Sequence, residues 1–120
     1  MRIADRVRQE LSLLILNKVS DPRLKGIYIT EVTIDRELAF ANVYVSALEG
    51  AERIQEVLDG LNHAQSFLRR ELSQCIKLRT FPRLRFHWDP TPERAEQIEH
   101  LINSLRSDPN DQEVNINAKS

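Results

Sequence analysis

The segment from Leu61 to Asp89 reads LNHAQSFLRRELSQCIKLRTFPRLRFHWD, and its pattern of apolar residues changes at Pro82. Before this proline, apolar residues recur every three or four positions, which places them on one side of an α-helix. They are Leu61, Ala64, Leu68, Leu72 and Ile76. After the proline, apolar and polar residues alternate, which is typical of a half-buried β-strand. The segment therefore predicts an amphipathic helix followed by a strand.

Positive charge is concentrated between Arg69 and Arg85, where six Lys and Arg residues accompany a single acidic residue, Glu71. The flanking ranges 27–68 and 86–120 each carry seven acidic residues, against two and three basic ones. A chain with a formal net charge of -1 thus has one strongly basic region. Such a region is typical of a surface that binds a polyanion, above all nucleic acid. The candidate RNA contacts in it are Arg69, Arg70, Lys77, Arg79, Arg83 and Arg85, with Ser66 and Ser73 as hydrogen-bond donors.

A chain of 120 residues with 41% hydrophobic and 29% charged residues is expected to form one ordinary globular domain. The single cysteine, Cys75, has no partner for an internal disulfide, which fits a reducing compartment. The N-terminus is too charged for a signal peptide, and no stretch approaches the ~20 apolar residues that span a bilayer. We therefore expect a cytoplasmic protein.

Upstream of the central segment, the sequence predicts one helix and one hairpin. Apolar residues at helical spacing indicate a helix from Arg2 to Lys18, which should stop by about Ser20 because of Pro22. The β-branched residues of 27–34 and the alternation in 39–46 predict two strands that are joined by a turn. The apolar phase shifts within the first strand, which indicates a β-bulge between Ile29 and Val32.

Residues 51–78 are predicted to be helical, because the apolar stripe keeps one phase throughout. We expect a kink in this helix at Ala64, Gln65 and Ser66. A serine there can cap a second helical segment that starts at Phe67.

The rest of the chain predicts a third strand over residues 84–89 and a final helix that begins near Thr91. The polar tail, residues 107–120, lacks periodicity and is expected to be disordered. Residues 1–106 would then form a single domain. Helices on one face of a three-stranded sheet give an α+β fold, a two-layer sandwich.

The joint order and spacing of several motifs resembles the ribosome-binding factor A family. These motifs include Asp21-Pro22-Arg23, the strand segment 41–46, Phe67-Leu68-Arg69, Pro82 and Asp89. The resemblance implies a type II KH-like fold with an added C-terminal helix, and an assembly factor that is not an enzyme. It also implies binding to the small (30S) ribosomal subunit and its ribosomal RNA during late maturation, with support of RNA processing and of growth in the cold. The implied partners are that RNA and ribosomal proteins of the 30S subunit, and the free chain would be a monomer.

KH domains clamp the nucleotide backbone with a Gly-x-x-Gly loop, and the three glycines of this chain do not have that spacing. The resemblance implies that an interruption of the helix replaces this loop. In the family, the interruption usually has the sequence alanine, any residue, glycine. In this chain Ser66 stands where the family has the glycine. Its Cβ disfavours a positive φ, whereas its hydroxyl can contact a phosphate or a ribose. Gly60 is interpreted as a glycine that the helix tolerates at a cost of about 1 kcal/mol.

The sequence is also compatible with two further RNA contacts and with a second function. Arg23 and Lys25 are further candidate RNA contacts, since a loop alone does not require them. The alternative function is a protein–protein adaptor or small homodimer that uses the hairpin edge and does not bind RNA. No histidine shares ligand spacing with Cys75, so we expect no metal site and no cofactor. His87 and Asp89 lack an accompanying nucleophile, which argues against an enzyme.

Overall fold

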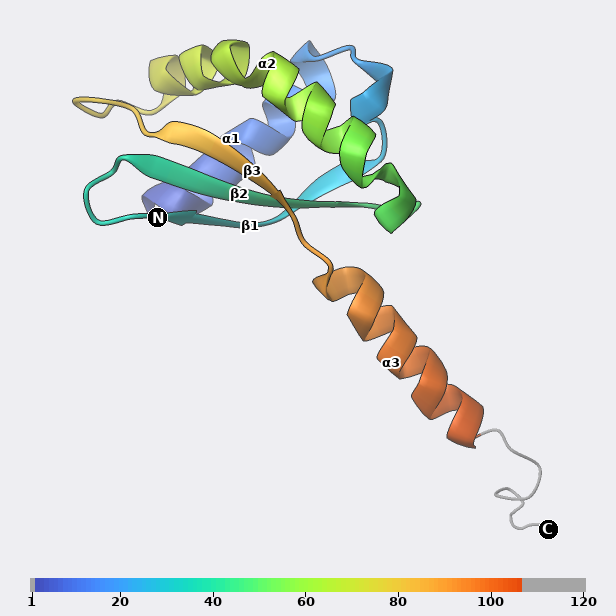
Figure 1. Ribbon diagram of the computed structural model, residues 1–120. Coiled ribbons are helices and arrows are strands. Elements are labelled where there is room, and N and C mark those ends of the chain that lie inside the picture. The colour runs from blue at the N-terminus through green and yellow to red at the C-terminus, as the bar shows by residue number, and fades with distance from the viewer. Residues whose placement is uncertain (1, 107–120) are drawn as a thin grey trace, which may run out of the picture. The chain divides into compact units, whose positions relative to one another are not determined.

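The computed structural model describes residues 2–106 and has the α+β architecture that the sequence predicts (Figure 1). The chain starts with α1 (Ile3–Lys18), the short 3-10 helix η1 (Pro22–Leu24), β1 (Ile27–Ile34) and β2 (Phe40–Ala47). It continues with the 3-10 helix η2 (Ala51–Arg53), α2 (Ile54–Cys75), β3 (Arg83–Trp88) and α3 (Thr91–Arg106). The predicted disordered tail, residues 107–120, lies outside the described residues.

The three strands form one mixed sheet in the order β1-β2-β3. β1 and β2 are antiparallel, and β3 joins β2 in parallel after the α2 crossover. The pairing register of the hairpin shifts between Ile29 and Glu31, which confirms the predicted bulge. Asp35 closes the hairpin turn, because its Oδ1 accepts the backbone N–H groups of Ala39 at 2.7 Å and Phe40 at 3.2 Å. β2 begins at Phe40, one residue later than the sequence predicts.

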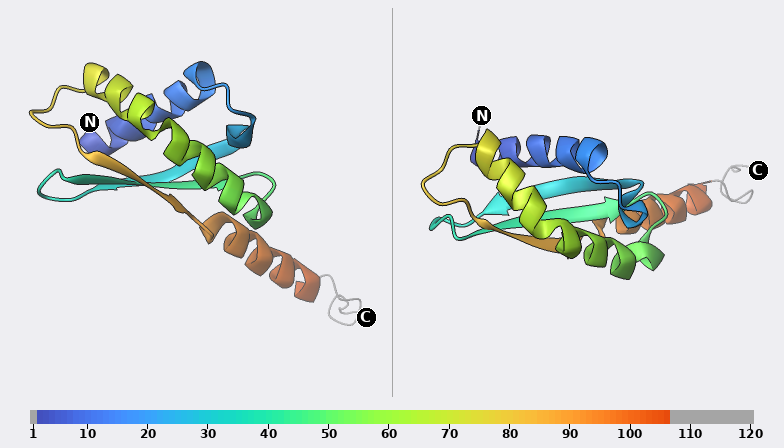
Figure 2. Two further views of the ribbon diagram at one scale, coloured as in Figure 1. Left: turned by 45° about the horizontal axis from the view of Figure 1, so that its top comes forward. Right: turned by 90° about the horizontal axis from the view of Figure 1, so that it is seen from above.

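One apolar core lies between the sheet and the two helices α1 and α2, which cover the same sheet face (Figures 1 and 2). α1 contributes Val7, Leu11, Leu14 and Ile15 to this core. α2 contributes Leu61, Leu68 and Leu72, all with a relative exposure of 0%. Alternate residues of the strands meet them, as the two-residue period of a strand requires. On β2 these are Ala41, Val43 and Val45.

α2 is one continuous α-helix across Ala64, Gln65 and Ser66, so the predicted second segment starting at Phe67 is wrong. The apolar stripe keeps its phase through the triplet, and intrahelical bonding leaves no free N–H group for a serine to cap. Ser66 is instead an exposed residue on the helix. The axis of α2 does bend partway along the helix, as Figure 1 and the right-hand view of Figure 2 show.

α2 ends at Cys75, three residues before the predicted end. Ile76 has extended backbone angles, with φ -118° and ψ 112°, and its N–H donates to the Leu72 carbonyl at 2.8 Å. Its side chain still fills the core. Lys77 therefore lies in the segment after α2, and not on the helix face where the sequence places it.

Gly60 allows η1 to pack closely against α2. A Cβ at this position would lie 2.9 Å from Cδ2 of Leu24 and 3.3 Å from Cβ of Arg23. Leu24 is itself buried, so it cannot move freely out of the way. The interpretation of Gly60 as merely tolerated is therefore incomplete, because the glycine lets the loop after α1 approach the helix.

α3 belongs to a second compact unit that begins at Pro90. It starts at Thr91, as the sequence predicts, and it is amphipathic. Its exposed apolar side chains are Ile98, Leu101, Ile102 and Leu105. The single domain over residues 1–106 stays a prediction. Among the helices of residues 2–106, none is both long enough and apolar enough to cross a membrane.

Replacing Gly60 by alanine is expected to lower the free energy of unfolding by about 1 kcal/mol. The helix gains about 1 kcal/mol in propensity, whereas overpacking against Leu24 costs about 1–3 kcal/mol. Chemical denaturation of Gly60→Ala, Leu24→Ala and the double variant measures both terms. In the Leu24→Ala background the clash with Leu24 is absent, so Gly60→Ala should raise the free energy of unfolding. Stabilisation in the wild-type background as well would contradict the close approach.

Candidate nucleic-acid interface

A concave site of about 760 Å³ lies between α2 and the β2–β3 half of the sheet. We call it the α2–β3 cleft. Five of the predicted contacts line it: Ser66, Arg69, Arg70, Ser73 and Arg83. The remaining lining residues are Phe40, Gln65, Phe81 and Leu84. The structure thus brings helix and strand residues of the basic segment together around one hollow.

Two lining residues tie α2 to the chain that leads into β3. Arg69 donates from Nε to the Pro82 carbonyl at 3.1 Å and from Nη2 to the Phe81 carbonyl at 2.6 Å. Gln65 donates from Nε2 to the carbonyl of Leu84. These bonds satisfy three backbone acceptors that the helix crossover would otherwise leave without a partner. Arg69 therefore has a structural role. Its side chain lines the cleft, but it is partly buried and held in place by these hydrogen bonds.

The other cations of the basic segment lie in the cleft or beside it and are accessible to a ligand. Arg70, Lys77, Arg79, Arg83 and Arg85 are exposed. Within residues 2–106, none of the five forms an ion pair with a carboxylate. Unpaired guanidinium groups around a concave surface raise the local positive potential and attract a polyanion.

The one acidic residue of the basic segment does not neutralise this surface. Glu71 lies on α2 with its Oε1 3.6 Å from Nζ of Lys18 on α1, so its charge is directed to the neighbouring helix. Ser73, which lines the cleft, donates its hydroxyl to the Arg70 carbonyl at 2.7 Å. Ser66 is exposed at the cleft wall.

Lys77 and Arg79 follow the end of α2 and do not line the cleft. Arg85 is on β3 two residues beyond Arg83, with its guanidinium carbon 3.4 Å from the ring centroid of Phe40. The predicted basic surface therefore consists of a cleft and two flanks, one at the end of α2 and one along β3.

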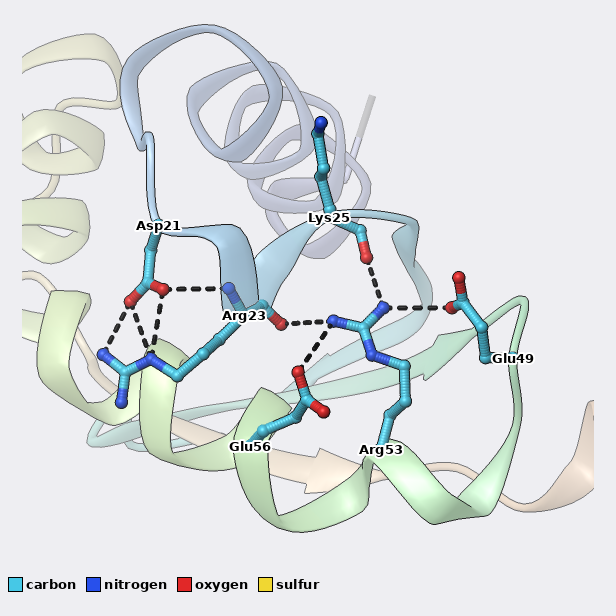
Figure 3. A network of polar contacts seen from close by, with 6 residues as sticks. All are labelled: Asp21, Arg23, Lys25, Glu49, Arg53 and Glu56. Atoms are coloured by element: carbon cyan, nitrogen blue, oxygen red, sulfur yellow. Dashed lines mark hydrogen bonds and ion pairs between the residues drawn. The ribbon is translucent and has the colours of Figure 1, made fainter.

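Arg23 and Lys25 lie in the segment between α1 and β1 (Figure 3), and neither lines the cleft. The Arg23 side chain is engaged by Asp21: Nη2 donates to Oδ2 at 2.6 Å and Nε donates to both oxygens. Hydrogen bonds from the Arg23 side chain, and secondarily from its backbone N–H, lower the pKa of the Asp21 carboxyl. Lys25 is exposed. The structure does not bring these two residues together with the other candidates.

Arg53, which the sequence reasoning missed, organises that loop. It donates from Nη2 to the Arg23 carbonyl at 2.7 Å and from Nη1 to the Lys25 carbonyl, while Glu49 and Glu56 hold its charge (Figure 3). Its side chain is only 11% exposed. A lone arginine before a helix gives no sequence signal for such a role.

Residues 2–106 contain no group of three His, Cys, Asp or Glu side chains that could hold a metal ion. His87, on β3, is hydrogen-bonded to a side chain of β2: its Nε2 lies 2.9 Å from Oδ1 of Asn42. The geometry of this surface instead suits the binding of an extended anion.

Arg69→Met is expected to lower the free energy of unfolding by about 2 kcal/mol, because it strands two carbonyls that a charged donor now satisfies. Arg70→Met is the matched control on the next position, where the side chain is exposed; a shift below about 0.5 kcal/mol is expected. Denaturant titrations of the two variants and the wild type measure these free energies of unfolding. Equal stability losses would show that Arg69 is no structural tie.

Comparison with known proteins relates this fold to one family. Residues 1–102 match the family model described as ribosome-binding factor A. The chain is 40% identical over 107 residues to ribosome-binding factor A of Aromatoleum aromaticum, covering 89% of this chain and 84% of that protein. It is 42% identical over 102 residues to the namesake of Nitrosomonas europaea, with coverages of 85% and 87%.

Solved structures give the same relation. The crystal structure of ribosome-binding factor A from Thermus thermophilus superposes with a TM-score of 0.65 at 26% identity, over 72% of this chain and 90% of that one. A homology model of the Thermus thermophilus factor, fitted into a cryo-electron microscopy map of its complex with the 30S subunit, gives a TM-score of 0.58 at 26% identity, over 69% and 87%. The KH-like α+β fold is thereby confirmed, and so is a function as a binding factor and not as an enzyme. The chain belongs to the ribosome-binding factor A family.

Proposed function

We propose that this protein binds the small ribosomal subunit and its ribosomal RNA during late maturation, with the α2–β3 cleft and its flanks as the RNA-binding surface. The observation that carries the proposal is the set of exposed cations around one hollow, which within residues 2–106 have no carboxylate partner. The Thermus thermophilus relative fitted into a map of a 30S complex supports the choice of subunit.

In the proposed complex, cations neutralise phosphates and hydroxyl groups supply hydrogen bonds. Arg70, Lys77, Arg79, Arg83 and Arg85 provide the charges for the phosphates, because all are exposed. The serines of the cleft, Ser66 and Ser73, add donors at its α2 wall. Arg69 instead maintains the shape of the cleft, through its hydrogen bonds to the Phe81 and Pro82 carbonyls. Contacts of this kind position a protein on RNA, and the shape of the folded RNA gives the specificity.

Ser66 defines how closely a backbone can approach α2. A glycine there would leave the wall without a Cβ, whereas serine adds one and places a hydroxyl at the cleft. We infer that the RNA backbone approaches α2 less closely in this protein, and that the Ser66 hydroxyl instead forms a hydrogen bond to a phosphate or a ribose hydroxyl. Lys25 remains a candidate for a separate RNA contact. Arg23 is a weaker one, because Asp21 already occupies its guanidinium group.

The charge distribution makes the proposed docking one-sided. The hairpin and the start of α2 carry exposed acidic side chains, which repel RNA and suit solvent or a basic ribosomal protein. They include Glu31, Glu37, Glu52, Glu56 and Asp59. Seated in this way, a cytoplasmic monomer of this size holds an immature RNA junction until a release factor displaces it, and so supports RNA processing and growth in the cold.

The proposal predicts a strong salt dependence of binding to purified 30S subunits. The logarithm of the affinity should fall with the logarithm of salt concentration by roughly 0.7–0.9 for each phosphate contact. Replacing Arg70 and Lys77 together by alanine should reduce that slope by about 2 and leave thermal stability nearly unchanged. Co-sedimentation at graded salt concentrations measures the slope.

The matched control removes the same charge elsewhere, through Arg36→Ala in the hairpin turn and Arg94→Ala on α3, both exposed. This variant should keep the wild-type slope. A similar loss in both double variants would show that net charge, and not the cleft, attracts the RNA. A weak salt dependence of the wild type would instead favour the adaptor function, in which β1, an edge strand, pairs with a partner strand.

A further inference from the structure

The sheet face opposite to α1 and α2 carries an ordered set of rings and guanidinium groups. β2 and β3 pair in parallel with Phe40 beside Arg83, Asn42 beside Arg85 and Tyr44 beside His87. The residues between them, such as Val43 and Phe86, point into the core. The two-residue period of a strand therefore directs these six side chains to the other face. Within residues 2–89, both helices lie on the core side of the sheet (Figures 1 and 2).

These side chains are already arranged as flat stacks. The Arg85 guanidinium carbon lies 3.4 Å from the ring centroid of Phe40. The Tyr44 and His87 rings are 5.0 Å apart with an interplanar angle of 26°. Asn42 fixes the imidazole, because its Oδ1 lies 2.9 Å from Nε2 of His87. Planar groups held in place lose little conformational freedom when a further flat group stacks on them.

A cross-strand ring pair stabilises a sheet by itself, so the stacks alone do not indicate a ligand. The charges supply the second argument. Arg83 and Arg85 are exposed on this face, and within residues 2–106 neither has a carboxylate partner. Positive charge interleaved with rings complements a polyanion that carries flat bases.

The sheet face is also continuous with the α2–β3 cleft. Phe40 and Arg83 line the cleft and belong to the sheet array as well. β3 is an edge strand, so no further strand separates the cleft from the array. On the other side, Glu31 of β1 pairs with Tyr44 and is exposed, which limits the favourable surface to β2 and β3.

We propose that this face of β2 and β3, with Arg85, Tyr44 and His87 at its centre, is a stacking platform for unpaired RNA bases. The proposal deepens the proposed function and rests on it, because the same strand would lie with its phosphates at the cleft and turn its bases over the edge of β3. Single-stranded segments are the RNA class whose bases can be splayed onto rings and guanidinium planes. The platform would thus select an unpaired segment next to a folded junction.

Two substitutions test the stacking without removing charge. Arg85→Lys keeps the positive charge but loses the planar group, and Tyr44→Leu keeps bulk but loses the ring. Each should weaken binding to a short oligoadenylate by roughly tenfold, as expected for one stacked base. The slope against salt should not change, because no phosphate contact is lost. Fluorescence anisotropy gives the affinities, and 2-aminopurine in the oligonucleotide reports base stacking directly.

Two controls separate stacking from misfolding. Tyr44→Phe keeps the ring and should bind as the wild type does. Tyr28→Leu removes an exposed ring from β1, the far edge of the sheet, and should have no effect. The inference is overturned if the wild type prefers an RNA duplex of equal charge to the oligoadenylate. It is also overturned if Arg85→Lys and Tyr44→Leu both bind oligoadenylate as tightly as the wild type.

Failure of this inference and failure of the proposed function give different results. If the platform variants bind as wild type while the Arg70 and Lys77 double variant releases the 30S subunit, stacking is wrong and the cleft stands. If the double variant keeps the subunit and the platform variants lose oligoadenylate, the cleft is wrong and the platform stands.

Discussion

The burial of one side of α2 on the sheet is the constraint on which the rest of the structure depends. Leu61, Leu68 and Leu72 are fully buried, and each contributes about 1.5–3 kcal/mol relative to an exposed side chain. Rotating α2 about its axis would expose all three at once. The helix period then requires Ser66 and Arg70 to face away from the core. The position of the basic surface is thus a consequence of core packing.

Core packing alone does not make a binding surface, because β3 must also lie at a defined distance from α2. Arg69 and Gln65 provide this through hydrogen bonds to the carbonyls of Phe81, Pro82 and Leu84. The cations on both sides of the cleft are therefore placed before any ligand arrives. A preorganised set of charges gains more from each phosphate, since less side-chain and loop ordering accompanies binding.

The sequence was a good guide wherever periodicity decides the structure. It predicts all the strands, the bulge after Ile29 and the buried side of α2, because apolar periods report directly which side is covered. It fails for the second helical segment that Ser66 was expected to cap, since a capping residue competes poorly with a helix whose apolar stripe continues. It also fails for Gly60 and Arg53, whose roles depend on the loop after α1, a contact between residues far apart in the chain.

The candidate site was predictable as a set of charges but not as a geometry. The clustering of positive charge in the sequence identified Arg70 and Arg83, and the structure places both at one cleft. The same criterion assigned Arg69 to RNA binding, although its guanidinium group is hydrogen-bonded to the backbone carbonyls of Phe81 and Pro82. Charge counts cannot distinguish a free guanidinium group from an engaged one. Arg23 shows the same difficulty, because Asp21 two residues earlier occupies it.

The most direct measurement is the reactivity of individual arginines toward phenylglyoxal, read by mass spectrometry in the free protein and in its complex with 30S subunits. Arg70, Arg79 and Arg83 should be protected in the complex, whereas Arg36 and Arg94 should be as reactive as in the free chain. Unchanged reactivity around the cleft, together with protection of Arg36, would contradict it.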